Sequence, residues 1–470
     1  MLSELRAREF ARLDAQQHVY LDYTGSALYA DSQLRAHHAL LRDGVFGNPH
    51  SEHRPSRAST KIIDAARELV LRFLDVDSAT HDVIFTANTT AAIKLVAESY
   101  PFAPGKTCVL AADNHNSING IREYARRAGT PVRTLPLDDE LRLRNPESIL
   151  EHVGPGLLAF PAQSNFSGVR HPLSLVARAK SLGYDVLLDI AALAPSCAIS
   201  LRECEADFAA LSFYKLFGYP TGLGALIARR DALARLRRPW FSGGTVLYAS
   251  VSSEIHQLRP RHEAFEDGTQ NFLGIAALAA GFSFLERVGM RTISAHVARL
   301  TSQFTRELAS LPHVRIYGPR SMIDRGGTIA FNLRGMPYQV VESRATLANI
   351  AIRGGCFCNP GCAEAALQLD PQRAAQCLSA LGEDFTVERF ASCVDAPVGA
   401  VRVSFGVANN DRDVQRAIEF FASLSWSSPR PACGERVAEG RVRGSTSSIT
   451  CDAPGRTTIA RVFDETSSPR

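Results

Sequence analysis

Short apolar segments alternate with stretches of helical periodicity between about residues 80 and 230. The predicted strands cover 82–85, 107–112, 156–162, 184–189, 206–212 and 224–228. The predicted helices cover 90–100, 119–129 and 172–183, where apolar residues recur three or four positions apart. Repeated strand–helix units predict an α/β fold with a mostly parallel sheet and helices on both of its faces. In such folds ligands bind at the carboxyl ends of the strands.

The pattern changes in the second half of the chain. Residues 269–310 have helical periodicity, and shorter strands are predicted over 314–318, 327–333 and 400–406. This mixture predicts a second, smaller α+β domain. The last segment is rich in Ser, Thr, Pro, Gly and Arg, so we expect it not to pack. The predicted organisation is an N-terminal segment 1–25, a large α/β domain 26–294, a small α+β domain 295–425 and a low-complexity tail 426–470.

Composition excludes several classes of protein. Hydrophobic residues make up 45% and charged residues 21% of the 470 positions, which is typical of a globular protein. The 52 basic and 48 acidic residues give a net charge of +4, which is too balanced to indicate a nucleic-acid or membrane partner. The charged amino-terminal segment and the absence of a long apolar run predict a cytoplasmic protein. In a reducing compartment we expect the ten cysteines to be buried, reactive or metal-bound rather than paired.

Lys215 is unusual among the five lysines, because Phe213, Tyr214 and Phe217 surround it and apolar strands lie on either side. Burial favours the unprotonated amine that a Schiff base needs, although a lysine extended along a strand edge is an alternative. Asp189 ends the apolar segment 184–189. A carboxylate at that edge could keep the ring nitrogen of pyridoxal phosphate protonated, or could simply cap the next helix.

Other strand ends also carry polar residues. Thr89 and Thr90 open a predicted helix after strand 82–85, where they could cradle a phosphate or serve as an ordinary cap. His115 follows strand 107–112 and could stack on a planar ring, or could be a capping or core histidine. Asn165 follows strand 156–162. Because parallel strands end at one edge of a sheet, we expect these side chains to converge there.

A cysteine cluster lies in a glycine-flanked turn of the small domain. Cys356, Cys358 and Cys362 precede a predicted helix, where a thiol can be exposed and partly ionised. No fourth Cys or His is near enough for a zinc site, so we expect no metal, while buried inert thiols stay an alternative. Arg402, on strand 400–406, could clamp a substrate carboxylate or could be a structural arginine.

The assembled motifs resemble the class V aminotransferase group of pyridoxal-phosphate enzymes, and within it the cysteine desulfurase domain of molybdenum cofactor sulfurases. The motifs are YLDYTGSALY, FGNPHS, DNHNSINGIRE, FPAQSNFSGVRHPLSL, SFYKLFGYPTGLGAL, FSGGTV, FEDGTQNFLGIAAL, RGGCFCNPGC and GAVRVSFG. The resemblance extends from about residue 18 to residue 424. It implies a homodimer of fold type I that takes sulfur from L-cysteine and releases alanine.

The resemblance also implies roles for individual residues. Lys215 matches the lysine that binds the cofactor covalently, Asp189 the partner of the ring nitrogen, His115 a stacking and catalytic histidine, and Asn165 an amide beside the ring hydroxyl. Thr89, Thr90, Ser212 and Thr245 match phosphate contacts, the last from the other subunit. Arg402 matches the anchor of the substrate carboxylate. Cys358 matches the nucleophile that stores sulfur as a persulfide.

Three functions follow from these residues. The first is a cysteine desulfurase that passes sulfur to an acceptor protein or to molybdenum cofactor. The second is a carbon–sulfur lyase acting on a cysteine conjugate, for which Lys215 suffices and Cys358 is incidental. The third is a non-catalytic scaffold with the same fold, against which the presence of Lys215, Asp189 and Arg402 argues.

Overall fold

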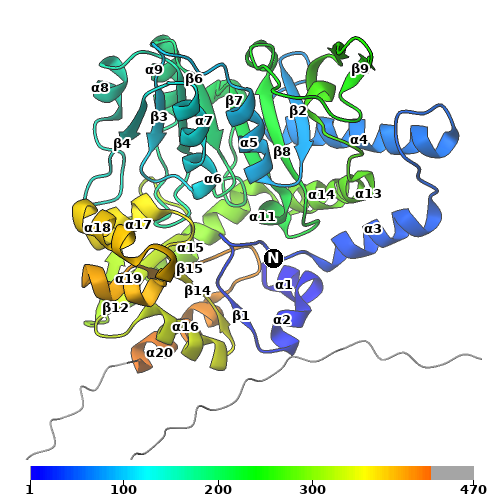
Figure 1. The fold of residues 1–470 in the computed structure, drawn as a ribbon. Coiled ribbons are helices and arrows are strands. Elements are labelled where there is room, and N and C mark those ends of the chain that lie inside the picture. Colours follow the sequence, from blue (N-terminus) through cyan, green and yellow to red (C-terminus); the bar gives the residue numbers. More distant parts are fainter. Residues whose placement is uncertain (1, 425–470) are drawn as a thin grey trace, which may run out of the picture. The chain divides into compact units, whose positions relative to one another are not determined.

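The computed structural model describes residues 2–424, and a seven-stranded sheet is its largest sheet (Figure 1). The strands of this sheet are β2 (His81–Thr86), β3 (Cys108–Ala111), β4 (Val132–Leu135), β5 (Leu157–Pro161), β6 (Asp185–Asp189), β7 (Phe208–Ser212) and β8 (Gly224–Arg229). Their order is β2-β8-β7-β6-β5-β3-β4. All neighbours are parallel except β8, which runs antiparallel to both β2 and β7. The predicted mostly parallel sheet is therefore confirmed.

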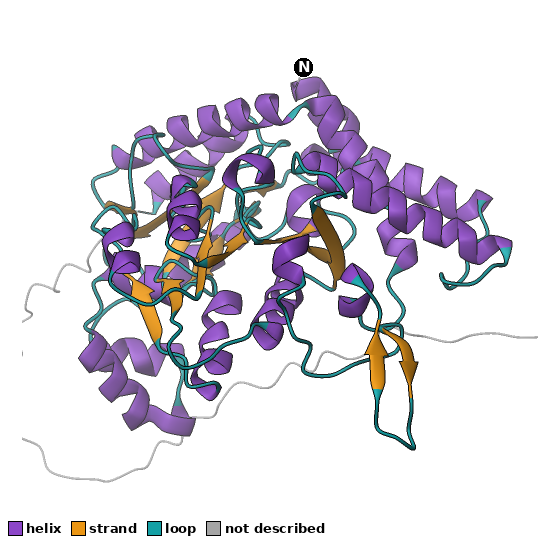
Figure 2. Cartoon of the chain, turned by 90° about the horizontal axis from the view of Figure 1, so that it is seen from above, coloured by secondary structure: helices purple, strands orange, loops and turns teal. Residues whose placement is uncertain are grey.

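Helices cover both faces of the sheet (Figure 2). The helices of the first 290 residues are α1 (Leu2–Glu9), α2 (Ala11–Ala15), α3 (Asp31–Asp43), α4 (Arg54–Phe73), α5 (Thr89–Ser99), α6 (Asn116–Asn119), α7 (Ile121–Arg127), α8 (Pro146–Glu151), α9 (Ser174–Ser181), α10 (Leu201–Cys204), α11 (Phe213–Phe217), α12 (Arg230–Leu233), α13 (Phe272–Ala276) and α14 (Leu278–Val288). Strand periodicity assigns neighbouring residues to opposite faces. Val186 and Leu188 pack in the core with α4 and α9, whereas Leu187 packs in a separate core with α5 and α7. Burial on both faces explains why the strands are continuous apolar runs.

A second sheet has four antiparallel strands in the order β11-β12-β15-β14. The strands are β11 (Val314–Tyr317), β12 (Thr328–Leu333), β14 (Arg353–Gly355) and β15 (Ala400–Ser404). The helices of this part are α15 (Met290–Ala309), α16 (Tyr338–Leu347), α17 (Pro360–Leu367), α18 (Pro371–Leu381), α19 (Val387–Val394) and α20 (Asp411–Ser423). Phe304, Phe331 and Phe421 form its aromatic core, with the rings of Phe331 and Phe421 5.0 Å apart. The predicted boundary at 294/295 falls inside α15, and the predicted tail from residue 426 lies outside the described residues.

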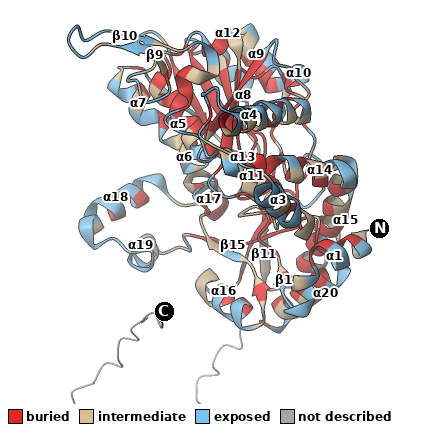
Figure 3. Cartoon of the chain, turned by 90° about the vertical axis from the view of Figure 1, so that its right-hand side faces the viewer, coloured by how far each residue is buried: buried red, intermediate tan, exposed pale blue. Residues whose placement is uncertain are grey.

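Two short strand pairs complete the structure. Strand β1 (Val19–Tyr20) pairs in parallel with β13 (Ile350–Ala351), which joins the amino-terminal segment to the residues just before β14. Strands β9 (Val246–Ala249) and β10 (His256–Leu258) form an antiparallel hairpin that projects from the rest of the fold (Figure 3). Among the described residues no single helix is long and apolar enough to cross a membrane, although Phe272–Val288 and Met290–Ala309, bent by 70°, pass that test together.

The expectation that no cysteine is paired is wrong at one place. Cys377 and Cys393 form a disulfide with their Cα atoms 5.9 Å apart. Helices α18 and α19 pack against each other and bring the two residues together, although they are 16 positions apart in sequence. The periodicity of either helix gives no sign of this pairing.

Candidate active site

The carboxyl ends of β2, β3, β5, β6 and β7 meet around a cavity of about 330 Å³. Its polar lining residues are Asn88, Thr89, Thr90, His115, Ser117, Gln163, Asn165, Asp189, Ser212, Tyr214, Lys215 and Thr221. Seven predicted site residues are in this set: Thr89, Thr90, His115, Asn165, Asp189, Ser212 and Lys215. The strand order thus brings together residues that are up to 126 positions apart in sequence (215 − 89).

Lys215 lies in α11, one turn after β7 ends. The neighbouring residues Phe213, Leu216 and Phe217 are buried and fix this short helix against the core. Burial lowers the pKa of the Lys215 amine, the nearby carboxylate of Asp189 partly offsets that effect, and Arg402 adds to it. The amine therefore loses its proton more readily than a solvated lysine does, as a nucleophilic lysine requires.

Asp189 is the last residue of β6, and its side chain faces the same cavity. Its Oδ1 accepts a hydrogen bond from the Ala191 amide at 2.9 Å. Residues 190–200 form no helix, so the alternative role of capping a following helix is wrong. Burial raises the pKa of Asp189, while Lys215 and the Ala191 amide act in the opposite direction. One carboxylate oxygen is left to meet a cationic ring nitrogen, which would relieve the cost of its burial.

The beginning of α5 forms an anion cradle. Asn88, and not a threonine, caps this helix, since its side chain accepts from the Ala91 amide at 3.0 Å. The alternative of an ordinary threonine cap is therefore wrong. The Thr89 and Ser212 hydroxyls are 2.6 Å apart, and Ser212 Oγ also accepts from the Thr89 amide. These donors at a helix N-terminus suit a phosphate group.

His115 fulfils the capping role, while its stacking on a ring stays a prediction. It caps α6, because its Nδ1 accepts from the Ser117 amide at 3.1 Å, and it lines the cavity. Burial lowers the pKa of His115 to about 4, and the cationic Lys215 and Arg402 contribute. The imidazole is therefore neutral near pH 7, and the Ser117 amide assigns the remaining proton to Nε2.

Arg402 lies outside the cavity lining but is buried directly beside it. Its terminal nitrogens donate to the Asn165 carbonyl at 3.0 Å and to Asp22 Oδ1 at 2.8 Å. Asp22 also receives hydrogen bonds from Arg353, the shortest at 2.6 Å. The Arg402 Nε is buried without a partner, so part of its hydrogen-bonding capacity is free for an anionic ligand.

The three clustered cysteines differ sharply in exposure. Cys358 is exposed, Cys356 is partly buried and Cys362 is fully buried. Burial raises the pKa of Cys362 well above its ordinary value, which keeps it a protonated thiol. Asn116, next to the cavity residue His115, donates its amide to the Cys358 carbonyl at 2.7 Å. Among residues 2–424 no three His, Cys, Asp or Glu side chains group as a metal site requires.

Thr245 does not join this cavity in the single chain. Its side chain is fully buried and exchanges hydrogen bonds with the backbone of Ser242, immediately before the projecting hairpin. The predicted contact with the phosphate of another subunit therefore stays a prediction.

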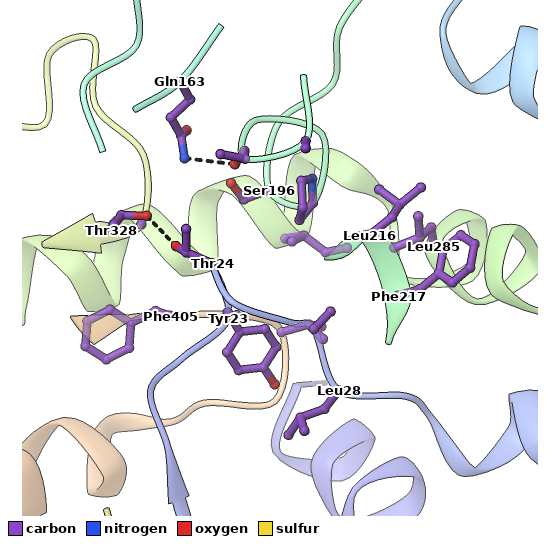
Figure 4. A pocket seen from close by; sticks show the side chains of 18 of the residues that line it. Tyr23, Thr24, Leu28, Gln163, Ser196, Leu216, Phe217, Leu285, Thr328 and Phe405 are labelled. Atoms are coloured by element: carbon purple, nitrogen blue, oxygen red, sulfur yellow. Dashed lines mark hydrogen bonds between the residues drawn. The ribbon is translucent and has the colours of Figure 1, made fainter. Parts of the chain in front are cut away.

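Sequence reasoning missed Gln163, which forms part of the cavity wall. Its Nε2 donates to the Ala192 carbonyl at 2.9 Å, and behind it lies a second cavity of about 40 Å³ (Figure 4). In that space the hydroxyls of Thr24 and Thr328 are 2.6 Å apart. The second cavity is large enough for little more than water, and Gln163 lines both cavities. Its position two residues before Asn165 was the only signal in the sequence.

The donor set fits pyridoxal phosphate. An amine of lowered pKa, a buried carboxylate, a neutral histidine and a hydroxyl-rich helix terminus each match one functional group of that cofactor. The cavity is also at the lower end of the usual range for small-molecule sites. Lys215 would bind the aldehyde carbon, Asp189 the ring nitrogen, and Thr89 with Ser212 the phosphate.

Comparison with known proteins agrees with the geometry. The model of the class-V aminotransferase family matches residues 19–417. Molybdenum cofactor sulfurase from Arabidopsis thaliana is 34% identical, in an alignment that covers 94% of this chain and 60% of that protein. A solved cysteine desulfurase from Thermococcus onnurineus NA1 is 26% identical with a TM-score of 0.76, covering 90% of this chain and 97% of the other.

A further solved structure, with glycine covalently linked to its pyridoxal-phosphate cofactor, shares the fold at a TM-score of 0.69 and 18% identity over 89% of this chain and 99% of the other. These findings confirm the predicted fold type I. The chain therefore belongs to the class-V aminotransferase family, and it is a pyridoxal-phosphate-dependent enzyme.

Proposed function

We propose that this chain is a cysteine desulfurase that moves sulfur from L-cysteine to Cys358 and then to an acceptor. One observation carries the proposal: the only exposed thiol of the cysteine cluster stands next to the cavity that contains Lys215 and Asp189. The Cys362 thiol of the same cluster is buried and protonated. A carbon–sulfur lyase would not need an exposed cysteine beside the site.

Each site residue has a separate role in the proposed reaction. Bound pyridoxal phosphate supplies an electron sink for the substrate carbon. Arg402 binds the substrate carboxylate through its donors, and Lys215 takes the proton from the substrate α-carbon and returns one later. The Cys358 thiolate attacks the substrate sulfur, and the carbon–sulfur bond breaks with its electron pair on carbon. That carbon takes a proton and leaves as alanine, while Cys358 retains the sulfur as a persulfide.

The relatives support the acceptor chemistry without fixing the acceptor. The matched curated relatives are named molybdenum cofactor sulfurases, and this chain spans 60% of the length of the Arabidopsis protein. We propose that the persulfide passes to a protein thiol or to molybdenum cofactor, and that the enzyme works as a homodimer. The exposed apolar side chains of the β9–β10 hairpin support dimerisation.

Cys358→Ser tests the role of the exposed thiol. With L-cysteine as substrate, we expect sulfide release in the presence of a dithiol to fall at least about 100-fold, because the serine hydroxyl is a far poorer nucleophile toward sulfur. The visible absorbance of the bound cofactor should be unchanged, since Cys358 does not line the cavity. Cys197→Ser, at a partly buried free cysteine outside the cluster, is the matched control and should retain activity.

Product analysis separates this proposal from the lyase alternative. Alanine formed in equal amount with sulfide supports the desulfurase. Pyruvate and ammonia from a cysteine conjugate, with full activity in Cys358→Ser, would contradict it.

A further inference from the structure

The turn that carries Cys358 has an unfavourable backbone conformation. The Asn359 amide donates to the Cys356 carbonyl at 3.0 Å, which closes a four-residue turn. Both central residues are left-handed, with φ of +57° at Phe357 and +56° at Cys358. Turns of this kind normally contain Asn and Gly, since other residues are disfavoured in this region. Contacts from outside the turn must therefore hold it in place.

Two backbone contacts hold the turn from the side of the cavity. The amide of Asn116 donates to the Cys358 carbonyl at 2.7 Å, and Asn165 Nδ2 donates to the Phe357 carbonyl at 2.8 Å. The Phe357 ring is buried under the guanidinium of Arg402, 4.6 Å from its carbon. These residues belong to the site already described or adjoin it.

A third anchor lies below the turn, at the fully buried Asn359. Its Nδ2 donates to Asp113 Oδ1 at 2.7 Å, to the Asp113 carbonyl at 3.1 Å and to Asn165 Oδ1 at 3.0 Å. Its Oδ1 accepts from the Cys362 amide at 3.2 Å and so caps α17. One side chain thus joins the end of the turn, the helix after it and the cavity residue Asn165.

Asp113 is in turn fixed by a buried polar network. Its Oδ1 also accepts from Ser164 Oγ at 2.7 Å, and its Oδ2 lies 2.8 Å from His171 Nε2. Both Asp113 and His171 have fully buried side chains. His171 Nδ1 is buried without a partner, so its ring is held through Nε2. None of Asp113, His171 and Asn359 lines the cofactor cavity.

We propose that Asp113 and Asn359 are positioning residues that hold the Cys358 turn in its sulfur-accepting position. They act on Cys358 through the backbone and through Asn165, and touch neither cofactor nor substrate. The proposal rests on the proposed function only in that Cys358 accepts the sulfur. Such an anchored network keeps the reacting thiol within the narrow distance that sulfur transfer requires.

Three variants of the holoenzyme test the network. Asn359→Asp removes the amide donors and places a second carboxylate against Asp113. The double variant Asp113→Asn with Asn359→Asp restores a hydrogen bond in the reverse direction. Asn409→Asp is the matched control, because the buried Asn409 donates in the same way to Asp413 at 3.1 Å, outside the site. Asp113→Asn alone is a milder substitute if Asn359→Asp does not fold.

The first measurement is the rate of Cys358 alkylation by iodoacetamide without substrate. We expect about a tenfold increase in Asn359→Asp, as loss of a buried hydrogen bond to a charged group would produce, and none in Asn409→Asp. The second is single-turnover persulfide formation with L-cysteine. This rate should fall about tenfold or more in Asn359→Asp and should recover in the double variant. The cofactor content of Asn359→Asp, and the spectral change that substrate induces in it, should both equal those of the wild type.

The two measurements separate the possible failures. If Asn359→Asp and Asn409→Asp have the same alkylation rate and the same rate of persulfide formation, the positioning role is wrong. It is also wrong if the double variant restores neither rate. If the wild-type enzyme forms no persulfide while alkylation responds as expected, the network stands and the proposed function fails.

Discussion

At the scale of single residues, the chemistry depends on side chains whose charges are tuned by burial. Lys215 and His115 both have lowered pKa values and Asp189 a raised one, and in all three burial is the largest cause. Groups shifted in this way around one cavity are typical of catalytic sites. The sequence could not supply these shifts, since they arise from the packing around each group.

Asp22 is the residue that we expect to control substrate affinity. It accepts hydrogen bonds from both Arg402 and Arg353 and thereby fixes the guanidinium of Arg402. In Asp22→Asn we expect the KM for L-cysteine to rise about tenfold with little change in kcat, since one charge-assisted hydrogen bond is weakened. Steady-state kinetics measures this.

Asp413→Asn is the control for Asp22→Asn, because Asp413 accepts from the buried Arg6 at 2.6 Å in the same manner. An unchanged KM in Asp22→Asn, or an equal rise in both variants, would refute the positioning of Arg402 by Asp22.

His115 gives the cofactor-free protein a pH-dependent stability. Its pKa is about 4 in the folded protein against 6.5 ordinarily, so the unfolded chain binds this proton more tightly. Its contribution to the free energy of unfolding is therefore complete above pH 6.5 and is lost as the pH falls toward 4. From pH 7 to pH 5 we expect this effect to lower the free energy of unfolding of the wild type by about 2 kcal/mol. We expect that decrease to be absent in His115→Gln. Urea unfolding at both pH values checks it, and an identical pH dependence in the variant would exclude the effect.

At the scale of elements, periodicity predicted most strands of the large sheet, but neither its edge strand β4 nor the disulfide between two helices. All six strands predicted between residues 82 and 228 are present, because strands buried on both faces are unbroken apolar runs. The 3.6-residue period likewise indicated the helices of 269–310. Strand β4 was missed, since Val132, Arg133 and Thr134 are partly or fully exposed at the sheet edge. The Cys377–Cys393 disulfide was missed as well, because it depends on how two helices pack.

The same contrast holds for the candidate site. Residues at strand ends, such as Asp189 and Asn165, could be predicted because parallel strands share a carboxyl edge. Asp113 and Asn359 could not, since their roles come from contacts between positions 246 apart in sequence. Nor does the sequence pattern show that Asp22 accepts hydrogen bonds from two arginines of the four-stranded sheet.

The β9–β10 hairpin is the element that we expect to mediate dimerisation. It exposes Leu247, Tyr248 and Ile255 by about 60% each and Val251 almost completely. Charges in such an apolar patch oppose association. We expect the double variant Leu247→Asp with Tyr248→Asp to sediment as a monomer.

Leu347→Asp, at an exposed leucine of α16, is the control for the hairpin variant and should sediment like the wild type. A wild-type protein that is monomeric at micromolar concentration, or a hairpin variant that still dimerises, would contradict this role of the hairpin.

At the scale of the whole molecule, the two sheets carry different residues of the proposed reaction. The seven-stranded sheet provides Lys215, Asp189 and the phosphate cradle, and the four-stranded part provides Arg402 and the Cys358 turn. Hydrogen bonds from Arg402 and Asn359 to Asn165 join the two parts directly at the site. The arginine proposed to bind the substrate carboxylate and the turn proposed to accept sulfur therefore both contact Asn165.

The most direct measurement uses purified holoenzyme, L-cysteine labelled at sulfur, and peptide mass spectrometry after a single turnover. We predict one labelled sulfur atom on the peptide that contains Cys358, and an equal amount of alanine in solution. Label on another cysteine, or turnover of cysteine with no labelled peptide at all, would contradict the account.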